Sequence, residues 1–468
     1  MYLTTKSFVK LCLLCTLFIN ILLFTVYKKD TFSSYYYLFN FLSFFTSILV
    51  FKYSIDRFRN KELTTSYLFK VSIVFRILIF CILYYILYYF YNADLSIEEY
   101  DTTFYDNLGT KLVYIYKNNF SIDNIHSLIK GIEFDDLGYP FILSLKYLFF
   151  RSIIISKLIQ AIVDSLSVVL IYKISIDLFN SRIAKLSSLF SSIFLPMITM
   201  AFITTKEVYM TFFTLLCIYS YQMLSKNKSK SYIIYLIFSI LILFSMRTVF
   251  AIIVLLSIIV SLFFNSKKSI KKKIFYPIFI FIGLLLMLGL FGFYNEVKIK
   301  TFAYAGISLG EESNIGGRSQ DEYLMKGQSF AKYASLPVLF TQALITPYPS
   351  LSLTNMQHWG ISMQWFFSGG LFLWVFSAFF CIKGMILSLS NKKALHILLI
   401  IILYTIVLLS SFYITSIRFN ILKINIMLIF FGYGFMYQSK KTKLTFYIYS
   451  LLISITIFIW NYAKIHGR

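Results

Sequence analysis

Residues 70–92, KVSIVFRILIFCILYYILYYFYN, form a nearly continuous apolar run that ends at a long polar segment. A helix of about 20 apolar residues crosses the roughly 30 Å hydrocarbon core of a bilayer, and runs of this kind recur along the chain. Hydrophobic residues make up 59% of the sequence, and its mean hydropathy is +0.75. This composition argues against a soluble globular protein and predicts an all-α polytopic membrane protein.

The hydropathy pattern predicts about thirteen transmembrane helices. They cover residues 7–27, 34–53, 70–92, 152–176, 183–203, 208–224, 231–246, 249–264, 274–294, 361–388, 394–413, 421–438 and 444–461. The first has a charged start, Lys6 and Lys10, and no small-residue cleavage site follows it. We therefore interpret it as an uncleaved span.

Basic side chains predict how the chain is oriented. The formal net charge is +24, and Lys and Arg in short loops favour the cytoplasmic side of a membrane. The predicted spans place every basic loop cluster on one face: Arg57, Arg59, Lys61; Arg182, Lys185; Lys226, Lys228, Lys230; Lys267, Lys268, Lys271, Lys272, Lys273; Lys392, Lys393; Lys440, Lys441, Lys443. We expect a cytoplasmic amino terminus, an outer carboxyl terminus, anionic membrane lipids as secondary partners and no nucleic-acid partner.

The same rule decides two ambiguous segments. Residues 141–150 are apolar but too short to cross alone, and counting them would move every later basic cluster to the other face, so a half-helix or interfacial helix is predicted. Residues 231–264 could form one long helix with Arg247 in its middle. Because that helix would separate Lys226 from Lys267, we predict two short helices that turn outside at Arg247.

Two long segments, 93–151 and 295–360, remain on the outer face. The second is polar and is predicted to be a mobile loop that returns to the membrane. In the first, apolar residues recur at helical spacing and predict two short amphipathic helices lying in the membrane interface. These residues are Phe104, Leu108, Leu112, Ile115, and then Ile122, Ile125, Leu128, Ile129, Ile132.

An acidic and aromatic patch begins the first outer segment, with Asp101 and Tyr105 four residues apart. Ionisable groups at the edge of a bilayer rarely persist for packing alone, although a solvated loop carboxylate is the alternative explanation. The five cysteines lie scattered in apolar segments and the four histidines show no ligand spacing, so we predict no metal site. No glycine-rich phosphate loop precedes a basic residue, which argues against a nucleotide-sugar donor.

Several separated blocks together resemble the GT-C membrane glycosyltransferases, most closely the bacterial branch related to protein O-mannosyltransferases and to the aminoarabinose transferase of lipid A. The resemblance is best over residues 70–264. Its blocks, in order, are Asp101, Tyr105 and Leu108; Gly138, Tyr139 and Pro140; Leu178 and Phe179; Pro196; Lys206 and Glu207; Arg418, Phe419 and Asn420. An additional apolar hairpin precedes these blocks, and the late outer segment has no counterpart in the pattern.

The resemblance implies transfer of a sugar from a polyprenyl-phosphate donor to an envelope lipid, glycan or protein, with inversion of the anomeric centre. Asp101 matches the catalytic position and is expected to act as general base. Lys206 matches the place near the carrier phosphate, and the outer-end cations Arg247 and Arg418 would meet phosphate oxygens with a planar fork. A snorkelling side chain at a helix end explains each cation equally well.

The remaining candidates have supporting roles. Glu207 is expected to orient Lys206, and Glu99 to assist Asp101 or to bind a divalent cation, which stays an open alternative because no cofactor is firmly implied. Tyr105 and Tyr139 would stack on sugar or support the loop, although an interfacial aromatic belt also explains them.

The resemblance also suggests a division of the chain. Residues 1–69 would be an extra N-terminal hairpin with a cytoplasmic loop, 70–294 a GT-C-like catalytic module with outer loop 93–151, 295–360 an outer loop, and 361–468 the C-terminal helices. The expected location is the bacterial cytoplasmic membrane.

Two other classes of protein stay open. A polysaccharide polymerase or ligase of the O-antigen type would use a late outer loop such as 295–360 and would not need Asp101. A lipid-linked oligosaccharide flippase would need charges deep within several spans. The main candidates for such charges, Lys157, Asp164 and Lys173, fall on one predicted helix.

Overall fold

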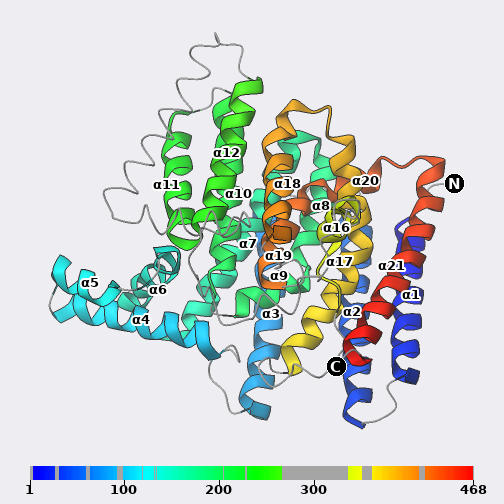
Figure 1. The fold of residues 1–468 in the computed structure, drawn as a ribbon, viewed down its shortest axis with the longest axis horizontal. Helices are drawn as coiled ribbons and strands as arrows, with labels where there is room; N and C mark the ends of the chain where they lie inside the picture. Colours follow the sequence, from blue (N-terminus) through cyan, green and yellow to red (C-terminus); the bar gives the residue numbers. More distant parts are fainter. Residues whose placement is uncertain are drawn as a thin grey trace, which may run out of the picture.

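The fold is an assembly of helices (Figure 1). This computed structural model describes residues 4–26, 31–58, 64–91, 99–118, 120–130, 132, 134–203, 205–226, 229–265, 336–349, 361–410 and 417–466. Every regular element over these residues is a helix, and they contain no strand. The predicted all-α class is confirmed.

Most of the long helices follow the predicted spans. In chain order the helices are α1 (Thr5–Val26), α2 (Thr31–Phe58), α3 (Thr65–Tyr91), α4 (Glu99–Asn118), α5 (Ile122–Ile129), η1 (Phe134–Asp136), α6 (Gly138–Phe149), α7 (Ile153–Leu178), α8 (Ser181–Ser192), α9 (Leu195–Phe202), α10 (Glu207–Ser225), α11 (Ser231–Met246), α12 (Thr248–Asn265), α16 (Leu336–Ile345), α17 (Ile361–Leu387), η4 (Lys392–Ala394), α18 (Leu395–Ser410), α19 (Ile417–Met427), η6 (Leu428–Phe430), α20 (Phe431–Met436) and α21 (Lys440–His466). In contrast, α16 lies within the predicted outer loop 295–360, where no helix was expected, and packs against α17 and α18.

The predicted number of membrane crossings is not confirmed. Among the described residues, eight helices are long and apolar enough to cross a membrane, or up to nine if the bent pair α8–α9 is one span, and α11 and α12 are shorter apolar helices. The prediction was about thirteen. The predicted span 274–294 and residues 295–335 of the predicted late outer loop lie outside the described residues.

The predicted single span 183–203 is wrong in detail, because the chain breaks within it. α8 ends at Ser192, α9 starts at Leu195, and the two helices meet at 48°. Pro196 lies in the first turn of α9, where proline is tolerated because that N–H needs no helical partner, whereas a proline inside a helix disrupts it. The Arg76 guanidinium donates to the freed carbonyl of Ser192 at 3.2 Å.

The turn at Arg247 is as predicted. α11 ends at Met246, Arg247 is extended with φ −164° and ψ 97°, and α12 begins at Thr248. The short apolar segment after Gly138 forms α6, which has 12 residues and is too short to cross a bilayer.

The two amphipathic helices predicted in residues 93–151 are confirmed as α4 and α5, and their apolar faces meet, whereas their place in the membrane interface stays a prediction. Ile125, Leu128 and Ile129 of α5 pack against Leu108 and Leu112 of α4. Leu137 and Phe141, at the start of α6, join the same small core. α4 and α5 run across the direction of α3, α11 and α12 (Figure 1). Leu108 and Leu112 are buried, whereas α5 has no buried residue and its Ile122 is 78% exposed, so the contact covers the apolar stripe of α5 only in part.

The two ends of the bundle carry different chemistry. At one end Lys226, after α10, pairs with Asp177 of α7, and Asn391 donates to the Leu178 carbonyl. The end of α12 meets η4 there. The turn between α11 and α12 lies at the opposite end of these two helices, where α11 meets α6 (Figure 1). The described basic loops thus gather at one end, as predicted, and that this end is cytoplasmic stays a prediction.

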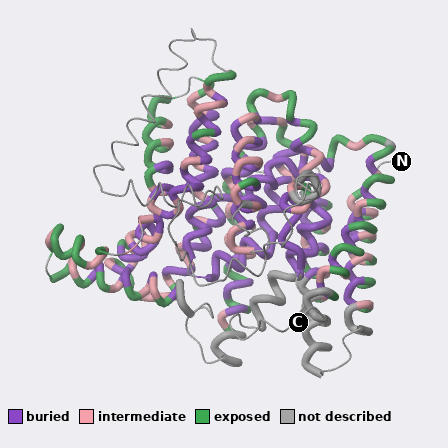
Figure 2. The backbone as a smooth tube through the Cα atoms, viewed as in Figure 1, coloured by how far each residue is buried: buried purple, intermediate pink, exposed green. Residues whose placement is uncertain are grey.

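The two marked termini lie at opposite ends of α21, with the N label beside its start and the C label beside its end (Figure 1). α1 and α2 pack against α17 and α21, with the Phe8 ring 5.6 Å from that of Phe380 and 5.8 Å from that of Phe435. Burial is concentrated in the central helices, whereas α5, α11 and α21 carry many exposed residues (Figure 2). The predicted N-terminal hairpin is thus bound to the C-terminal helices.

Candidate functional site

Charged side chains from distant segments meet where the first outer segment touches the helix ends. The Lys206 ammonium donates to the Asp136 carboxylate at 2.5 Å and to the Asp135 carbonyl at 2.8 Å. The same Asp136 oxygen accepts from the Tyr105 hydroxyl at 3.1 Å. Lys206 therefore connects η1 and α4 to the start of α10.

Lys206 lies in the short break between α9 and α10. Lys206 is the residue before α10 and is only 3% exposed. Burial lowers the pKa of Lys206, and the nearby Arg247 lowers it further, whereas Asp136 and Asp135 act in the opposite direction. A buried cation is stable only when it is paired, and the Asp136 carboxylate is the charged partner of Lys206 here.

A second ion pair lies next to the first. Arg418, in the first turn of α19, donates from Nε to Oε1 of Glu207 at 2.6 Å. The guanidinium carbon of Arg247 lies 4.2 Å from the centre of the Phe419 ring, a cation–π contact. Three cations and three carboxylates therefore share one region: Lys206, Arg247, Arg418, Asp135, Asp136 and Glu207.

Tyrosine rings form one wall of this region. The centres of the Tyr105 and Tyr139 rings are 5.2 Å apart, and those of Tyr139 and Tyr209 are 5.8 Å apart. Tyr105 and Tyr139 are 2% and 0% exposed. Burial also raises the pKa of Tyr139, so its hydroxyl stays protonated. Of the two roles predicted for these tyrosines, burial favours support of the loop over stacking on a sugar.

The structure brings most of the predicted residues together. Tyr105, Tyr139, Lys206, Glu207, Arg247 and Arg418 all belong to the region just described. Glu99 and Asp101 lie on the first turn of α4, and their side chains are outside the described residues. Position 101 precedes Tyr105 by about one helical turn, so both positions lie on the same face of α4.

Sequence reasoning missed Asp135, Asp136 and Gln160. Adjacent carboxylates directly before the Gly138 block were a usable signal, because they precede a predicted half-helix at the membrane edge. Gln160 had no such signal, since one amide in an apolar span is more often a buried hydrogen-bonding residue than part of a site.

Another lysine, Lys146 of α6, lies beyond Tyr139. Its ammonium donates to Ser156 at 3.0 Å and stands 5.0 Å from the centre of the Tyr209 ring. Burial lowers the pKa of Lys146 to about 7. On the same helix the Tyr147 hydroxyl donates to Asp106 at 2.5 Å, which fixes α6 on α4.

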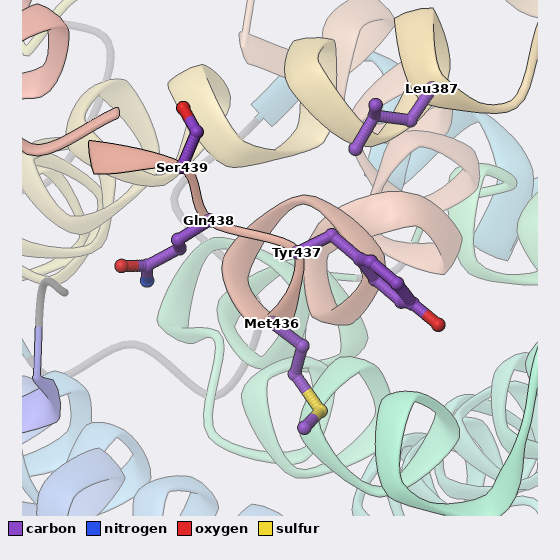
Figure 3. A pocket seen from close by; sticks show the side chains of 5 residues that line it. All are labelled: Leu387, Met436, Tyr437, Gln438 and Ser439. Carbon is purple, nitrogen blue, oxygen red and sulfur yellow. The ribbon is translucent and has the colours of Figure 1, made fainter. Parts of the chain in front are cut away.

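No metal centre is formed by the described side chains, which include no group of three or more His, Cys, Asp or Glu residues suited to hold an ion. An open hollow of about 490 Å³ lies elsewhere, between the end of α17 and the connection from α20 to α21 (Figure 3). Its lining is uncharged: Leu387, Met436, Tyr437, Gln438 and Ser439. It lies near Lys383, which donates to the Tyr437 carbonyl, and it shares no residue with the charged region.

The helical fold and this charged region define a multi-pass membrane protein with an ionic site at one end of its bundle. Residues 138–291 match the family model for dolichyl-phosphate-mannose-protein mannosyltransferases, a family of the GT-C superfamily. This match agrees with the GT-C resemblance seen in the sequence and supports a membrane glycosyltransferase of that superfamily in general. The match begins at α6 and includes Lys206, Glu207 and Arg247, but neither Asp101 nor Arg418. Neither curated proteins nor solved structures give a significant match to the chain.

Proposed function

We propose that this glycosyltransferase moves a sugar from a polyprenyl-phosphate donor to an envelope lipid, glycan or protein on the outer face of a bacterial cytoplasmic membrane. One observation carries the proposal. Lys206, Arg247 and Arg418 come from three separate helix boundaries and gather beside the first outer segment. Cations at the edge of a membrane are the groups that a lipid-linked phosphate requires.

Orphaned polar atoms beside the cations support a ligand at this place. Among the described residues, Thr205 Oγ1, Glu207 Oε2 and Thr248 Oγ1 are buried and have no hydrogen-bond partner. Each belongs to, or is adjacent to, a residue of the charged region. Buried polar groups are normally paired, so these atoms are suited to contact a phosphate or sugar hydroxyls when the donor is bound.

The proposed reaction is a direct displacement. The acceptor oxygen or nitrogen attacks the anomeric carbon, the bond from that carbon to the phosphate oxygen breaks, and the polyprenyl phosphate leaves with the electron pair. Asp101 takes the acceptor's proton. Lys206, Arg247 and Arg418 stabilise the negative charge that grows on the departing phosphate. Attack from the face opposite the phosphate inverts the anomeric centre.

The test compares purified wild-type protein with Asp101→Asn in transfer of labelled sugar from polyprenyl-phosphate donors to a membrane extract. Asp123→Asn is the matched control, since Asp123 is an exposed carboxylate of the same outer segment. General-base catalysis contributes about 10²–10⁴-fold, so Asp101→Asn should lose at least about 100-fold while Asp123→Asn stays near wild type. Equal rates for wild type and Asp101→Asn would remove Asp101 from the reaction.

The polymerase or ligase class and the flippase class receive less support. The family match lies before the late outer segment that a polymerase or ligase would use. The charges considered for a flippase pathway are engaged in packing: Asp164 pairs with Arg76 at 2.6 Å, and the Lys157 ammonium stands 4.1 Å from the centre of the Phe202 ring. A divalent cation at Glu99 stays an alternative, which loss of transfer on chelation would support.

A further inference from the structure

A chain of contacts leads from the Lys206 side chain to Gln160. Lys206 is bonded to Asp136, which accepts from Tyr105. The Tyr105 ring meets the Tyr139 ring edge to face. The Tyr139 hydroxyl then donates to Oε1 of Gln160 at 3.3 Å. These contacts connect α10, η1, α4 and α6 to α7.

Gln160 also contacts the backbone that leads to Lys206. Its side chain is fully buried on α7. The amide nitrogen Nε2 donates to the carbonyls of Ile203 at 2.9 Å, Thr205 at 3.2 Å and Met200 at 3.4 Å. Carbonyls at the end of a helix lack intrahelical partners, and these belong to the end of α9 and the turn that leads to Lys206. The Gln160 amide therefore contacts Tyr139, at the end of the chain that starts from the Lys206 side chain, and also the backbone carbonyls of the turn before Lys206.

We propose that Gln160 is a positioning residue that fixes Lys206 at the donor phosphate. This inference rests on the proposed function. An uncharged amide suits the place because it accepts from Tyr139 and donates to several carbonyls at once. A lysine or arginine could not accept that bond and would repel Lys206, and a carboxylate could not donate. Release of the turn would leave the Lys206 ammonium free to leave the position in which it meets the phosphate, and loss of preorganisation weakens binding, so the donor should bind less tightly.

The experiment is a double-mutant cycle on the full-length protein. Gln160→Leu should raise the donor KM about tenfold or more, whereas the matched control Gln222→Leu should leave it unchanged. Gln222 is also buried, and its amide has no hydrogen-bond partner among the described residues. In a Lys206→Met background Gln160→Leu should have little further effect on the donor KM, because the group that it positions is already absent.

Binding of sugar-free polyprenyl phosphate provides a second readout that does not depend on turnover. The dissociation constant should rise with Gln160→Leu when Lys206 is present and stay constant in the Lys206→Met background. If Gln160→Leu raises the dissociation constant by the same factor with and without Lys206, the positioning role of Gln160 is overturned and its role is structural. If Gln160→Leu does not fold, Tyr139→Phe removes only the bond to Oε1 and should raise the constant a few-fold with the same dependence on Lys206.

The two proposals fail in different ways. Absence of transfer from every polyprenyl-phosphate donor by wild-type protein would refute the proposed function. Normal transfer by wild type together with an additive cycle would overturn only the role of Gln160.

Discussion

Arg418 and Glu207 are 211 positions apart in the sequence, yet Nε of Arg418 lies 2.6 Å from Oε1 of Glu207. The carboxylate is 3% exposed and the Arg418 side chain 16% exposed. This pair joins the start of α19 to the start of α10. It therefore fixes a C-terminal cation next to Lys206, which lies in the segment matched by the family model.

Loss of this pair should destabilise the protein. Arg418→Met leaves Glu207 buried with one fewer cation, and breaking a buried pair by removing one partner costs about 3–5 kcal/mol. We expect a cost near the lower end, about 3 kcal/mol, because Arg418 is partly exposed. Thermal unfolding in detergent measures it, with the exposed Arg182→Met at the opposite end as control. A melting temperature equal to that of wild type would contradict the prediction.

The ion pair between α3 and α7 should behave differently in single and double variants. Arg76 and Asp164 are 1% and 0% exposed and 2.6 Å apart. Arg76→Leu should cost about 3–5 kcal/mol because it leaves a buried carboxylate alone. The double variant Arg76→Leu with Asp164→Leu should recover most of that loss, as measured by denaturant unfolding. A double variant less stable than the single one would show that the pair itself stabilises the bundle.

A close approach of α17 and α20 should make Gly434 intolerant of a side chain. A Cβ at Gly434 would lie 2.8 Å from the Gly384 nitrogen and 2.9 Å from the Phe380 carbonyl carbon. Gly434→Ala should therefore push the helices apart and cost about 3 kcal/mol. Gly109→Ala is the control, since the nearest atoms to its Cβ would be those of the Leu143 side chain at 3.4 Å, an ordinary contact distance. Equal yields and melting temperatures for the two variants would refute this packing argument.

Donor binding should weaken at alkaline pH. Burial and Arg247 lower the pKa of Lys206 from 10.5, so the ammonium is lost at a lower pH than that of an exposed lysine. Since the charged form binds phosphate, the donor KM should rise as the pH increases through this lowered pKa. Lys206→Arg keeps its charge to higher pH, so the rise should move upward or disappear. A pH profile of the donor KM from about 7 to about 10.5 tests this, and coincident profiles would exclude Lys206 as the titrating group.

The outer hairpin shows how far the sequence pattern reaches. The spacing of Leu108, Leu112, Ile125 and Leu128 predicted two amphipathic helices, and α4 and α5 are those helices. The same spacing could not show what covers the apolar faces. Lipid and a neighbouring helix both satisfy an apolar stripe, and only the packing shows that the stripe of α5 is partly covered by α4.

The residues of the candidate site could likewise be predicted only in part from the sequence. Lys206, Glu207, Arg247 and Arg418 could be singled out because each charged side chain lies at the end of an apolar run. Asp136 also lies beside an apolar run, but the sequence pattern did not distinguish it as a site residue. Gln160 has no such feature, since it lies within an apolar span. Contacts of Gln160 with carbonyls 40–45 positions away depend on how α7 packs against the end of α9.

By itself the sequence determined the class of fold, most helix boundaries, the turn at Arg247 and the gathering of basic loops at one end. These follow from local free energies, namely the cost of placing polar or charged groups in hydrocarbon. The folded chain was needed to reveal three further features: the break between Ser192 and Leu195, the pairing of Arg418 with Glu207, and the set of contacts around Lys206. These depend on which helix ends meet, and that is fixed by side-chain packing between segments far apart in the chain.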